Sequence, residues 1–286
     1  MTRARYALQA TARNALKAPR VSSIQHEPAH TFTNTGSTRM PSFKDRARLI
    51  YWRLRARTHF NRNDVHGALH RAWAYAHATQ LSGDYYEFGV YRGHSLISSW
   101  LSYQRCNERI QNAKDLPYER KGSVANFMAH QTTFYGFDSF SGMPENDEGE
   151  DTLATGTFMA TEESTRKLCA AVGLTTPRLR LVPGLFSDNT HAIGSAPAAI
   201  VHLDCDLYLS TRDALNMIGP RLVQGSVLLC DDHDLFRASN DKGQRRALRE
   251  FLEQSQIELE PWFAYGAASR AYLCHVPNRD GQTASQ

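Results

Sequence analysis

From Asp84 onward the chain alternates short apolar runs with longer stretches of helical periodicity, and this alternation constrains the fold more than any other feature. Short apolar runs suit buried strands, and the stretches between them are long enough for helices. Regular alternation of the two is typical of a parallel sheet covered by helices. We therefore predict strands at residues 85–90, 133–138, 179–182, 199–204, 226–230, 257–261 and 271–276, with helices near 94–105, 161–172, 208–222 and 242–254.

The first 80 residues lack this alternation. Residues 1–26 contain five Lys or Arg residues and no acid, and residues 30–42 show no hydrophobic periodicity. We expect residues 1–42 to form a disordered basic arm, whose composition fits either a solvated extension or an organelle transit peptide. Residues 43–80 repeat apolar residues at helical spacing, which predicts two helices before the sheet.

Charge and cysteine usage argue against several classes of protein. The formal net charge is +4, but the first 60 residues hold twelve of the 33 Lys and Arg residues and two of the 29 acids, so the rest of the chain is acidic. A nucleic-acid partner would require a basic stripe on the folded body. Five dispersed cysteines without a CxxC pair favour a reducing compartment over a disulfide framework or a zinc knuckle. No apolar run approaches the ~18 residues of a membrane span, so we expect a cytoplasmic protein without a membrane partner, with organelle targeting left open.

The stretch Glu87–Ser95 is the first candidate binding motif. A predicted strand runs there into two glycines, Gly89 and Gly93, and then into a helix. Glycine lets a ligand approach the backbone closely, and the start of a helix offers free N–H groups. The spacing differs from the dinucleotide fingerprint, and the acid Glu87 would repel a pyrophosphate but suit a cationic amino group. A tight strand-to-helix turn with a solvated Glu87 explains the same residues without any ligand.

The second candidate is Asp138, which ends a predicted strand. An acid at the carboxyl end of the second strand of a doubly wound sheet is placed to accept hydrogen bonds from the two hydroxyls of a ribose. The alternative is an Asp that caps the following turn, in which Gly142 and Pro144 take part. The segment 141–160 beyond it has no periodicity and follows a strand's carboxyl end, so we expect it to form a lid.

The third candidate is a set of aspartates at the ends of two predicted strands. Asp204 and Asp206 are two residues apart, so in extended chain they project to one side. Asp231 and Asp232 end the next strand at the same sheet edge. Carboxylates crowded into one pocket raise one another's pKa values, so a hard divalent cation is the natural partner, and Mg²⁺ fits better than Zn²⁺. A helix cap explains one aspartate but not four; the neighbouring His233 could be a ligand, a base or a polar rim residue.

In this order the three motifs resemble the macrocin O-methyltransferase family, whose members are Mg²⁺-dependent and S-adenosylmethionine-dependent sugar O-methyltransferases of macrolide and aminocoumarin biosynthesis. The resemblance extends over roughly residues 80–276. It implies that residues 81–278 form a class I methyltransferase domain, a Rossmann-like doubly wound sheet that is mostly parallel with an antiparallel C-terminal strand. It also implies the cofactors S-adenosylmethionine and Mg²⁺, a small-molecule hydroxyl acceptor, and a homo-oligomer.

The resemblance further implies a role for each motif residue. The methionine end of the cofactor would lie against Glu87, Gly89, Tyr91, Gly93 and Ser95, and its ribose against Asp138 and Ser139. The metal ligands would be Asp204, Asp231 and Asp232. Asp206 would be the general base, and His233 is the competing candidate for that role.

Two positions depart from the family pattern. His94 stands where a second consecutive glycine is usual, and this exchange bears on the cofactor contacts. His233 and Asp234 follow the aspartate pair where an aromatic residue is commoner, and this exchange bears on the acceptor pocket.

The residues suit methyl transfer in chemical terms as well. An in-line displacement requires that an acceptor oxygen be oriented and helped to lose its proton. A metal held beside two neighbouring hydroxyls lowers the pKa of the reacting one, and a nearby carboxylate can take the proton. A sugar hydroxyl follows from the family, whereas the chemistry alone also allows another vicinal diol or a catechol-like pair.

Three other interpretations remain open. A glycosyltransferase also holds Mg²⁺ and a nucleotide sugar with an Asp-x-Asp pair, here Asp204 and Asp206, although the acid Glu87 argues against a diphosphate nearby. A nicotinamide dehydrogenase would require a glycine fingerprint that this sequence lacks. A protein that binds S-adenosylmethionine without turnover is the third, and the complete set of carboxylates argues against it.

Overall fold

The computed structural model describes residues 63–112, 118–146 and 153–277, together with four isolated positions between residues 47 and 54. The arm expected at residues 1–42 therefore lies outside the described residues, as does most of the first predicted helix. The second predicted helix is α3 (Val65–Thr79), which is confirmed. Asp64 caps its first turn by accepting a hydrogen bond from the backbone N–H of Gly67 at 3.2 Å.

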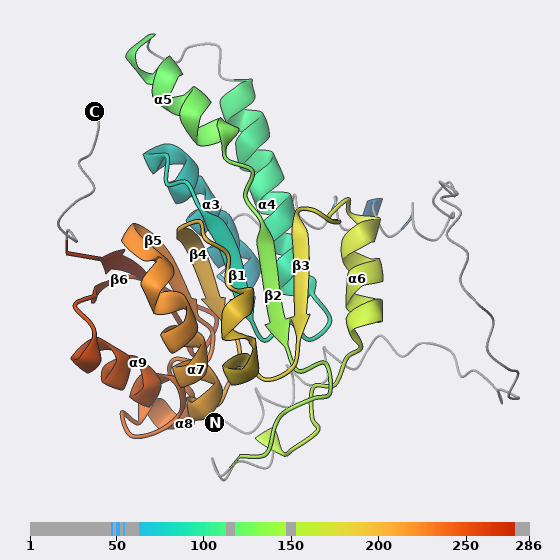
Figure 1. Ribbon diagram of the computed structural model, residues 1–286, viewed down its shortest axis with the longest axis vertical. Coiled ribbons are helices and arrows are strands. Elements are labelled where there is room, and N and C mark those ends of the chain that lie inside the picture. The colour runs from blue at the N-terminus through green and yellow to red at the C-terminus, as the bar shows by residue number, and fades with distance from the viewer. Residues whose placement is uncertain are drawn as a thin grey trace, which may run out of the picture. The chain divides into compact units, whose positions relative to one another are not determined.

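Seven strands form one sheet, as Figure 1 shows. They are β1 (Asp84–Phe88), β2 (Phe134–Asp138), β3 (Leu179–Pro183), β4 (Ala198–Leu203), β5 (Leu222–Cys230), β6 (Glu258–Tyr265) and β7 (Ser269–His275). The strand order is β3-β2-β1-β4-β5-β7-β6. Neighbours from β3 to β5 are parallel, and β7 runs antiparallel to both β5 and β6. The predicted fold class, mostly parallel with an antiparallel C-terminal strand, is confirmed.

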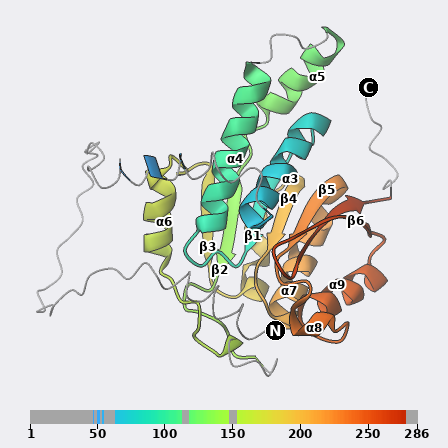
Figure 2. The same ribbon diagram turned by 180° about the vertical axis from the view of Figure 1, so that it is seen from behind.

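Helices cover both faces of the sheet. The remaining helical elements are α4 (His94–Gln111), α5 (Tyr118–Ala129), α6 (Glu162–Ala171), α7 (Tyr208–Ile218), α8 (Leu235–Ala238), α9 (Gly243–Gln254) and the short 3-10 turns η2 (Phe186–Ala192) and η3 (Gly219–Arg221). One apolar core joins the sheet to α3, α4 and α6, and the other joins it to α7 and α9. Figure 1 shows α7 and α9 in front of the sheet, and Figure 2 shows α3 and α4 over the opposite face.

Strand β1 shows how the sequence supplies both cores. All five of its residues are buried. Because side chains alternate along a strand, Tyr85 packs into the core beneath α3 and α4, whereas Tyr86 and Phe88 pack into the core beneath α7. A strand that is buried on both faces is mostly apolar, and the aromatic residues Tyr85, Tyr86 and Phe88 predicted this one although Asp84 and Glu87 interrupt the apolar run.

Several predicted elements differ from the observed ones. The helix expected over 208–222 ends at Ile218, and Pro220 follows in the 3-10 turn, where its missing N–H cannot continue an α-helix. Helix α5 was not predicted, because Tyr118–Ala129 has only a weak amphipathic pattern. Strands β5 and β6 are longer than expected. In the part of the chain that the structure describes, no helix is both long and apolar enough to cross a bilayer.

The strand order reverses between β1 and β4, and this reversal locates the site. In doubly wound sheets ligands bind at the carboxyl ends of the strands, beside such a switch point. The backbone N–H of Asp204, just past β4, donates to the carbonyl of Phe88 at 2.9 Å. The ends of β1 and β4 are thus held together, and the first and third sequence motifs meet there.

Candidate functional site

Three aspartates converge at the carboxyl ends of β4 and β5. One carboxylate oxygen from each of Asp204, Asp231 and Asp232 lies within 4.8 Å of the other two. The backbone continues the sheet pairing at this point, because the N–H of Asp231 donates to the carbonyl of Leu203 at 2.9 Å. The structure therefore brings together the three residues that the family resemblance named as metal ligands.

The electrostatics of this cluster favour a bound cation. Asp232 is only 8% exposed, and its burial, followed by the charges of Asp206, Asp204 and Asp231, raises its pKa well above the ordinary value. A hard divalent ion would remove this penalty, because it supplies positive charge to three oxygen donors. The residues present fit Mg²⁺ better than Zn²⁺, since no cysteine or histidine belongs to the group of three.

Asp206 lies beside the cluster but outside the group of three. Its backbone N–H donates to Oδ2 of Asp232 at 2.9 Å. We expected Asp204 and Asp206 to project to one side from extended chain, but β4 ends at Leu203 and Asp206 has a left-handed backbone with φ of 58°. The chain is therefore not extended at this point, because a left-handed residue turns it away from the strand axis. Such conformations are uncommon outside glycine and concentrate at functional sites.

Glu87, the acid before the first glycine, faces the interior. Its side chain is completely buried, and it accepts hydrogen bonds from the Tyr85 hydroxyl and from Oγ of Ser95, the latter at 2.8 Å. Nδ1 of His202 lies 3.5 Å from Oε2, the oxygen that also accepts from Tyr85. The solvated Glu87 of the alternative interpretation is wrong. In this conformation the carboxylate also has no exposed surface with which to meet a cofactor amino group.

Gly89 allows the loop after β1 to pass against the loop after β4. Its φ is 92°, and a Cβ added there would stand 1.8 Å from the carbonyl oxygen of Asp204. No side chain fits that space, so the requirement for glycine is steric as well as conformational. The glycine that we expected to admit a ligand thus also joins the first motif to the aspartate cluster.

Asp138 holds the same loop from the side of β2. Its Oδ2 accepts from the backbone N–H groups of Val90 and Tyr91 at 2.8 and 2.7 Å, and Oδ1 accepts from that of Phe140 at 2.7 Å. Ser139 donates through Oγ to the carbonyl of Gly142 at 2.6 Å. Asp138 therefore organises the glycine loop and the turn after β2, as the turn-capping alternative predicted. Its carboxylate keeps acceptor capacity, because two oxygens offer about four acceptor positions.

The segment expected to be a lid is folded in its described parts, 141–146 and 153–160. The N–H of Met143 donates to the carbonyl of Thr157 at 2.7 Å, and that of Gly156 donates to Met143 at 2.8 Å. Met143 and Leu153 pack with Leu207 in a small apolar cluster that Phe158 and Phe236 extend. The segment thus rests on the residue that follows Asp206. The ring of Phe158 also meets Tyr91 edge-on, with centroids 5.9 Å apart.

His233 is held on both sides of its ring. Nδ1 lies 2.7 Å from Oδ1 of Asp234, and Nε2 lies 2.7 Å from the hydroxyl of Tyr272. Burial lowers the pKa of His233, opposed by its hydrogen bond with Asp234. Burial alone would raise the pKa of Asp234, but hydrogen bonds from Arg270 and His233 outweigh it and lower that pKa to about 2. Arg245 of α9 also reaches this carboxylate at 3.0 Å.

The chain just beyond this network is unusual. Within α8, Phe236, Arg237 and Ala238 all have positive φ, at 54°, 57° and 56°. A left-handed backbone at three consecutive residues other than glycine is unfavourable unless surrounding contacts stabilise it. The hydrogen bonds of Asp234 and the packing of Phe236 against the lid segment act against that preference.

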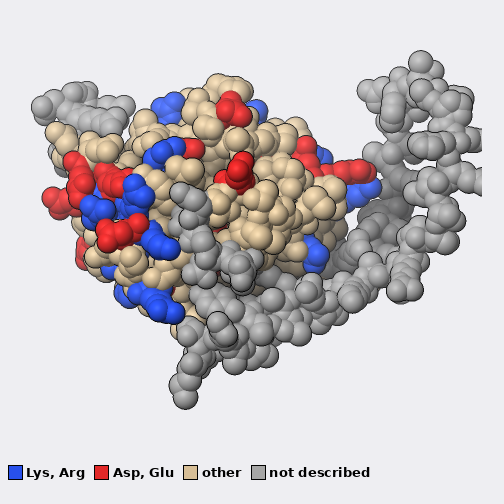
Figure 3. All heavy atoms as spheres, turned by 90° about the horizontal axis from the view of Figure 1, so that it is seen from below, with Lys and Arg blue, Asp and Glu red and all other residues tan. Residues whose placement is uncertain are grey.

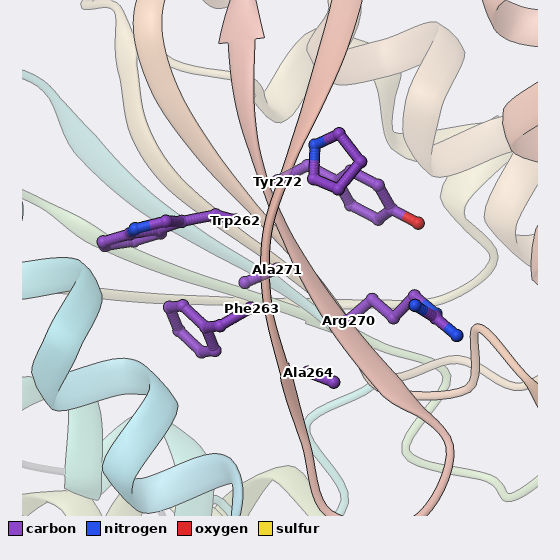
Figure 4. A pocket seen from close by; sticks show the side chains of 7 residues that line it. Trp262, Phe263, Ala264, Arg270, Ala271 and Tyr272 are labelled. Carbon is purple, nitrogen blue, oxygen red and sulfur yellow. The ribbon is translucent and has the colours of Figure 1, made fainter.

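A pocket of about 120 Å³ lies on the β6–β7 hairpin. Figure 4 shows Trp262 and Phe263 on one side of the hairpin and Arg270 and Tyr272 on the other. No aspartate of the cluster lines it. The hairpin contacts the site through Ser269, whose Oγ donates to the carbonyl of Asp231 at 2.6 Å, and through Arg270 and Tyr272, which hold the loop after β5.

Figure 3 shows the molecule from below, at the edge toward which β2 and β3 point in Figure 1. Isolated acidic side chains stand there among uncharged ones. Acidic and basic side chains mix at one side, where α9 lies, and its ion pairs include Arg246 with Glu250 and Arg249 with Glu253.

Sequence reasoning missed one residue of the site, His202. Its side chain is fully buried, with Nε2 3.8 Å from Oδ1 of Asp231 and Nδ1 near Glu87. Burial alone would lower its pKa, but the carboxylates of Asp231 and Glu87 outweigh burial and raise the pKa of His202 to about 10. The signal in the sequence was a basic side chain inside an otherwise apolar strand, Ala198–Leu203.

The sheet order, with its reversed last strand and its motifs at the switch point, defines a class I methyltransferase fold. The chain belongs to the macrocin O-methyltransferase family, because the model of that family, Macrocin-O-methyltransferase (TylF), matches residues 120–262, half of the chain. This confirms the resemblance seen in the sequence.

The chain is also similar to two curated relatives over part of its length. The 8-demethyl-8-(2,3-dimethoxy-alpha-L-rhamnosyl)-tetracenomycin-C 4'-O-methyltransferase of Streptomyces olivaceus is 35% identical over 34% of this chain and 40% of its own length. The demethyldecarbamoylnovobiocin O-methyltransferase of Streptomyces niveus is 28% identical over 54% and 53%. The chain thus spans about half or less of these relatives.

The solved structures show the fold alone. The O-methyltransferase NovP superposes with a TM-score of 0.56 at 22% identity, covering 73% of this chain and 78% of NovP. The calicheamicin methyltransferase CalS11 gives a TM-score of 0.52 at 16% identity, covering 85% of this chain and 99% of its own.

Proposed function

We propose that this protein transfers the methyl group of S-adenosylmethionine to a hydroxyl group of a sugar, with a divalent metal ion held by Asp204, Asp231 and Asp232. The observation that carries the proposal is the convergence of these three carboxylates within 4.8 Å, beside the glycine loop of β1. Mg²⁺ is the proposed ion, and when bound it would lower the pKa of an acceptor hydroxyl. Family membership supports the reaction class.

The glycine loop and Asp138 form the proposed cofactor site. Asp138 fixes the loop through two backbone N–H groups and keeps room to accept from a ribose hydroxyl. Tyr91 and Gly93 lie on the loop after β1, and Ser139 lies on the loop after β2. We propose that these three residues also contact the cofactor. Glu87 and Ser95 act on the cofactor indirectly, because both side chains are buried and their hydrogen bond holds the end of β1 against the first turn of α4 beneath the glycine loop.

Asp206 is the proposed general base. It lies next to Asp232, to which its backbone N–H donates, and it is not one of the three convergent carboxylates, so a role as base does not compete with the proposed metal ligation. A positioned carboxylate that takes a proton from a hydroxyl typically contributes ~10²–10⁴-fold to the rate. His233 is the weaker candidate, because both of its ring nitrogens already have partners and its pKa is lowered. We give it a positioning role instead, holding the loop that carries the aspartate pair.

The proposed acceptor is a sugar with neighbouring hydroxyls. The names of both relatives describe O-methylation of natural products, and the relative from Streptomyces olivaceus is named for a rhamnosyl group. Other vicinal diols would satisfy the same chemistry.

The test is methyl transfer from labelled S-adenosylmethionine to a panel of glycosides and polyols in the presence of Mg²⁺. Labelled product together with S-adenosylhomocysteine supports the proposal. Glycosyl transfer from a nucleotide sugar without use of S-adenosylmethionine would favour the glycosyltransferase alternative. Cofactor binding by calorimetry without product from any acceptor would favour the non-catalytic alternative.

A further inference from the structure

His202 lies between the proposed cofactor motif and the aspartate cluster. It stands on β4 directly beside Glu87 of β1, as their Cα register shows. Because alternate residues share a face, His202 projects on the same side of the sheet as Glu87 and Asp204. The next strand brings Asp231 to that side as well, since its N–H continues the pairing with β4.

The imidazole is enclosed and has a carboxylate at each end. It has no exposed surface, with Nδ1 3.5 Å from Glu87 and Nε2 3.8 Å from Asp231. Neither nitrogen has a partner in closer hydrogen-bond geometry. A fully buried polar ring of this kind is costly unless its neighbours compensate it, so the two carboxylates account for its place.

Glu87 is in turn held firmly. The Tyr85 hydroxyl and Ser95 Oγ both donate to its carboxylate, and these residues belong to β1 and the first turn of α4. Nδ1 of His202 therefore faces a carboxylate, that of Glu87, whose position is fixed by two hydrogen bonds. Nε2 faces a proposed metal ligand, Asp231, whose side chain is 24% exposed.

We propose that His202 is a positioning residue that orients the Asp231 carboxylate for the metal and is itself anchored by Glu87. This inference rests on the proposed metal site. Groups that hold a metal-ligating carboxylate in place typically account for 10–100-fold in metal affinity. Ser95, Glu87, His202 and Asp231 contact one another in this order, so a substitution at Ser95 or Glu87 should also alter the position of the Asp231 carboxylate.

Two substitutions separate the ends of the ring. His202→Asn places an amide near the position of Nδ1 and keeps a group facing Glu87 only, whereas His202→Gln reaches toward the position of Nε2 and Asp231. The readout is the dissociation constant of Mn²⁺ alone, measured by calorimetry or electron paramagnetic resonance. We expect His202→Asn to raise it about 10–100-fold and His202→Gln to raise it by clearly less. Equal losses in both variants, or no loss in His202→Asn, would overturn the proposal.

A second pair of variants tests the anchor without touching His202. Glu87→Gln should weaken Mn²⁺ binding although Glu87 is not in the cluster. Asp84→Asn is the matched control, a buried acid on the same strand whose partners are His130 and the N–H of Thr133. We expect Asp84→Asn to leave Mn²⁺ affinity unchanged even if it lowers the melting temperature. If Glu87→Gln also leaves Mn²⁺ affinity unchanged, Glu87 does not anchor His202.

The same Mn²⁺ titrations distinguish failure of the proposed metal site from failure of the role proposed for His202. Failure of the wild-type protein to bind Mn²⁺ would contradict the metal site of the proposed function. Wild-type binding that is unchanged in folded His202→Asn would contradict the role of His202 alone.

Discussion

Asp232→Asn should raise stability without metal and lower it with metal. Burial and the neighbouring aspartates raise the pKa of Asp232, so the folded state holds its proton more tightly than the unfolded state. Its favourable contribution is therefore complete below about pH 4 and is lost as the pH rises through the raised pKa. At neutral pH without metal the ionised carboxylate is a liability, which the neutral asparagine removes. Asparagine still keeps an oxygen for the N–H of Asp206.

The size of the effect follows from the distances. Two carboxylates 4.8 Å apart repel by about 3 kcal/mol at an effective dielectric constant of 20. Partial exposure of Asp204 and Asp231 weakens this, so we expect a net gain of about 1–3 kcal/mol. For a domain of this size that corresponds to a rise of roughly 2–12 °C in melting temperature. Wild-type protein should instead gain about 4.1 kcal/mol from Mg²⁺ at 1,000 times its Kd, which exceeds this advantage, and the variant should gain much less.

The assay is denaturant unfolding followed by circular dichroism at pH 5 and pH 8, in EDTA and in excess Mg²⁺. In EDTA the variant should be the more stable, with a larger margin at pH 8, and in Mg²⁺ the order should reverse. Asp241→Asn is the control, because the side chain of Asp241 is 89% exposed and lies outside the cluster. A variant less stable than wild type in EDTA, or equally stabilised by Mg²⁺, would refute this reasoning.

Three further predictions test other parts of the site. Asp206→Asn should lower turnover by ~10²–10⁴-fold while cofactor and metal affinity, measured by calorimetry, stay near normal; if His233→Gln alone abolishes turnover, the assignment of the base is wrong. Gly89→Ala should greatly reduce folded yield, because its Cβ would lie 1.8 Å from a backbone oxygen, whereas Gly173→Ala, with a similar φ in open space, should cost only about 1 kcal/mol in thermal unfolding. Asp138→Asn should weaken S-adenosylmethionine binding by roughly ten- to a hundredfold in calorimetry, and unchanged affinity would contradict its role.

The sheet was predictable because its evidence is local. Apolar runs such as Ala198–Leu203 are buried on both faces, so hydrophobicity alone marks them. The convergence of Asp204 and Asp231 was also predictable, since the carboxyl ends of neighbouring parallel strands meet at one edge. Helix α5 escaped prediction because its amphipathic pattern is weak.

The orientation of individual side chains was harder to predict, because it depends on partners distant in sequence. Glu87 turns inward since Ser95 and His202 meet it there, and no local pattern encodes that choice. The left-handed backbone of Asp206 likewise depends on packing and on its N–H contact with Asp232, since asparagine, aspartate and glycine are merely tolerant of it. The orientations of Glu87 and Asp206 are what the sequence alone did not predict about the site.

The most direct test of this account is a crystal structure of the protein with Mn²⁺ and S-adenosylhomocysteine, with anomalous diffraction used to locate the metal. The account predicts one strong anomalous peak bonded to oxygens of Asp204, Asp231 and Asp232 at about 2.1 Å, with the ligand ribose against Asp138. A peak elsewhere, or none at saturating Mn²⁺, would contradict it.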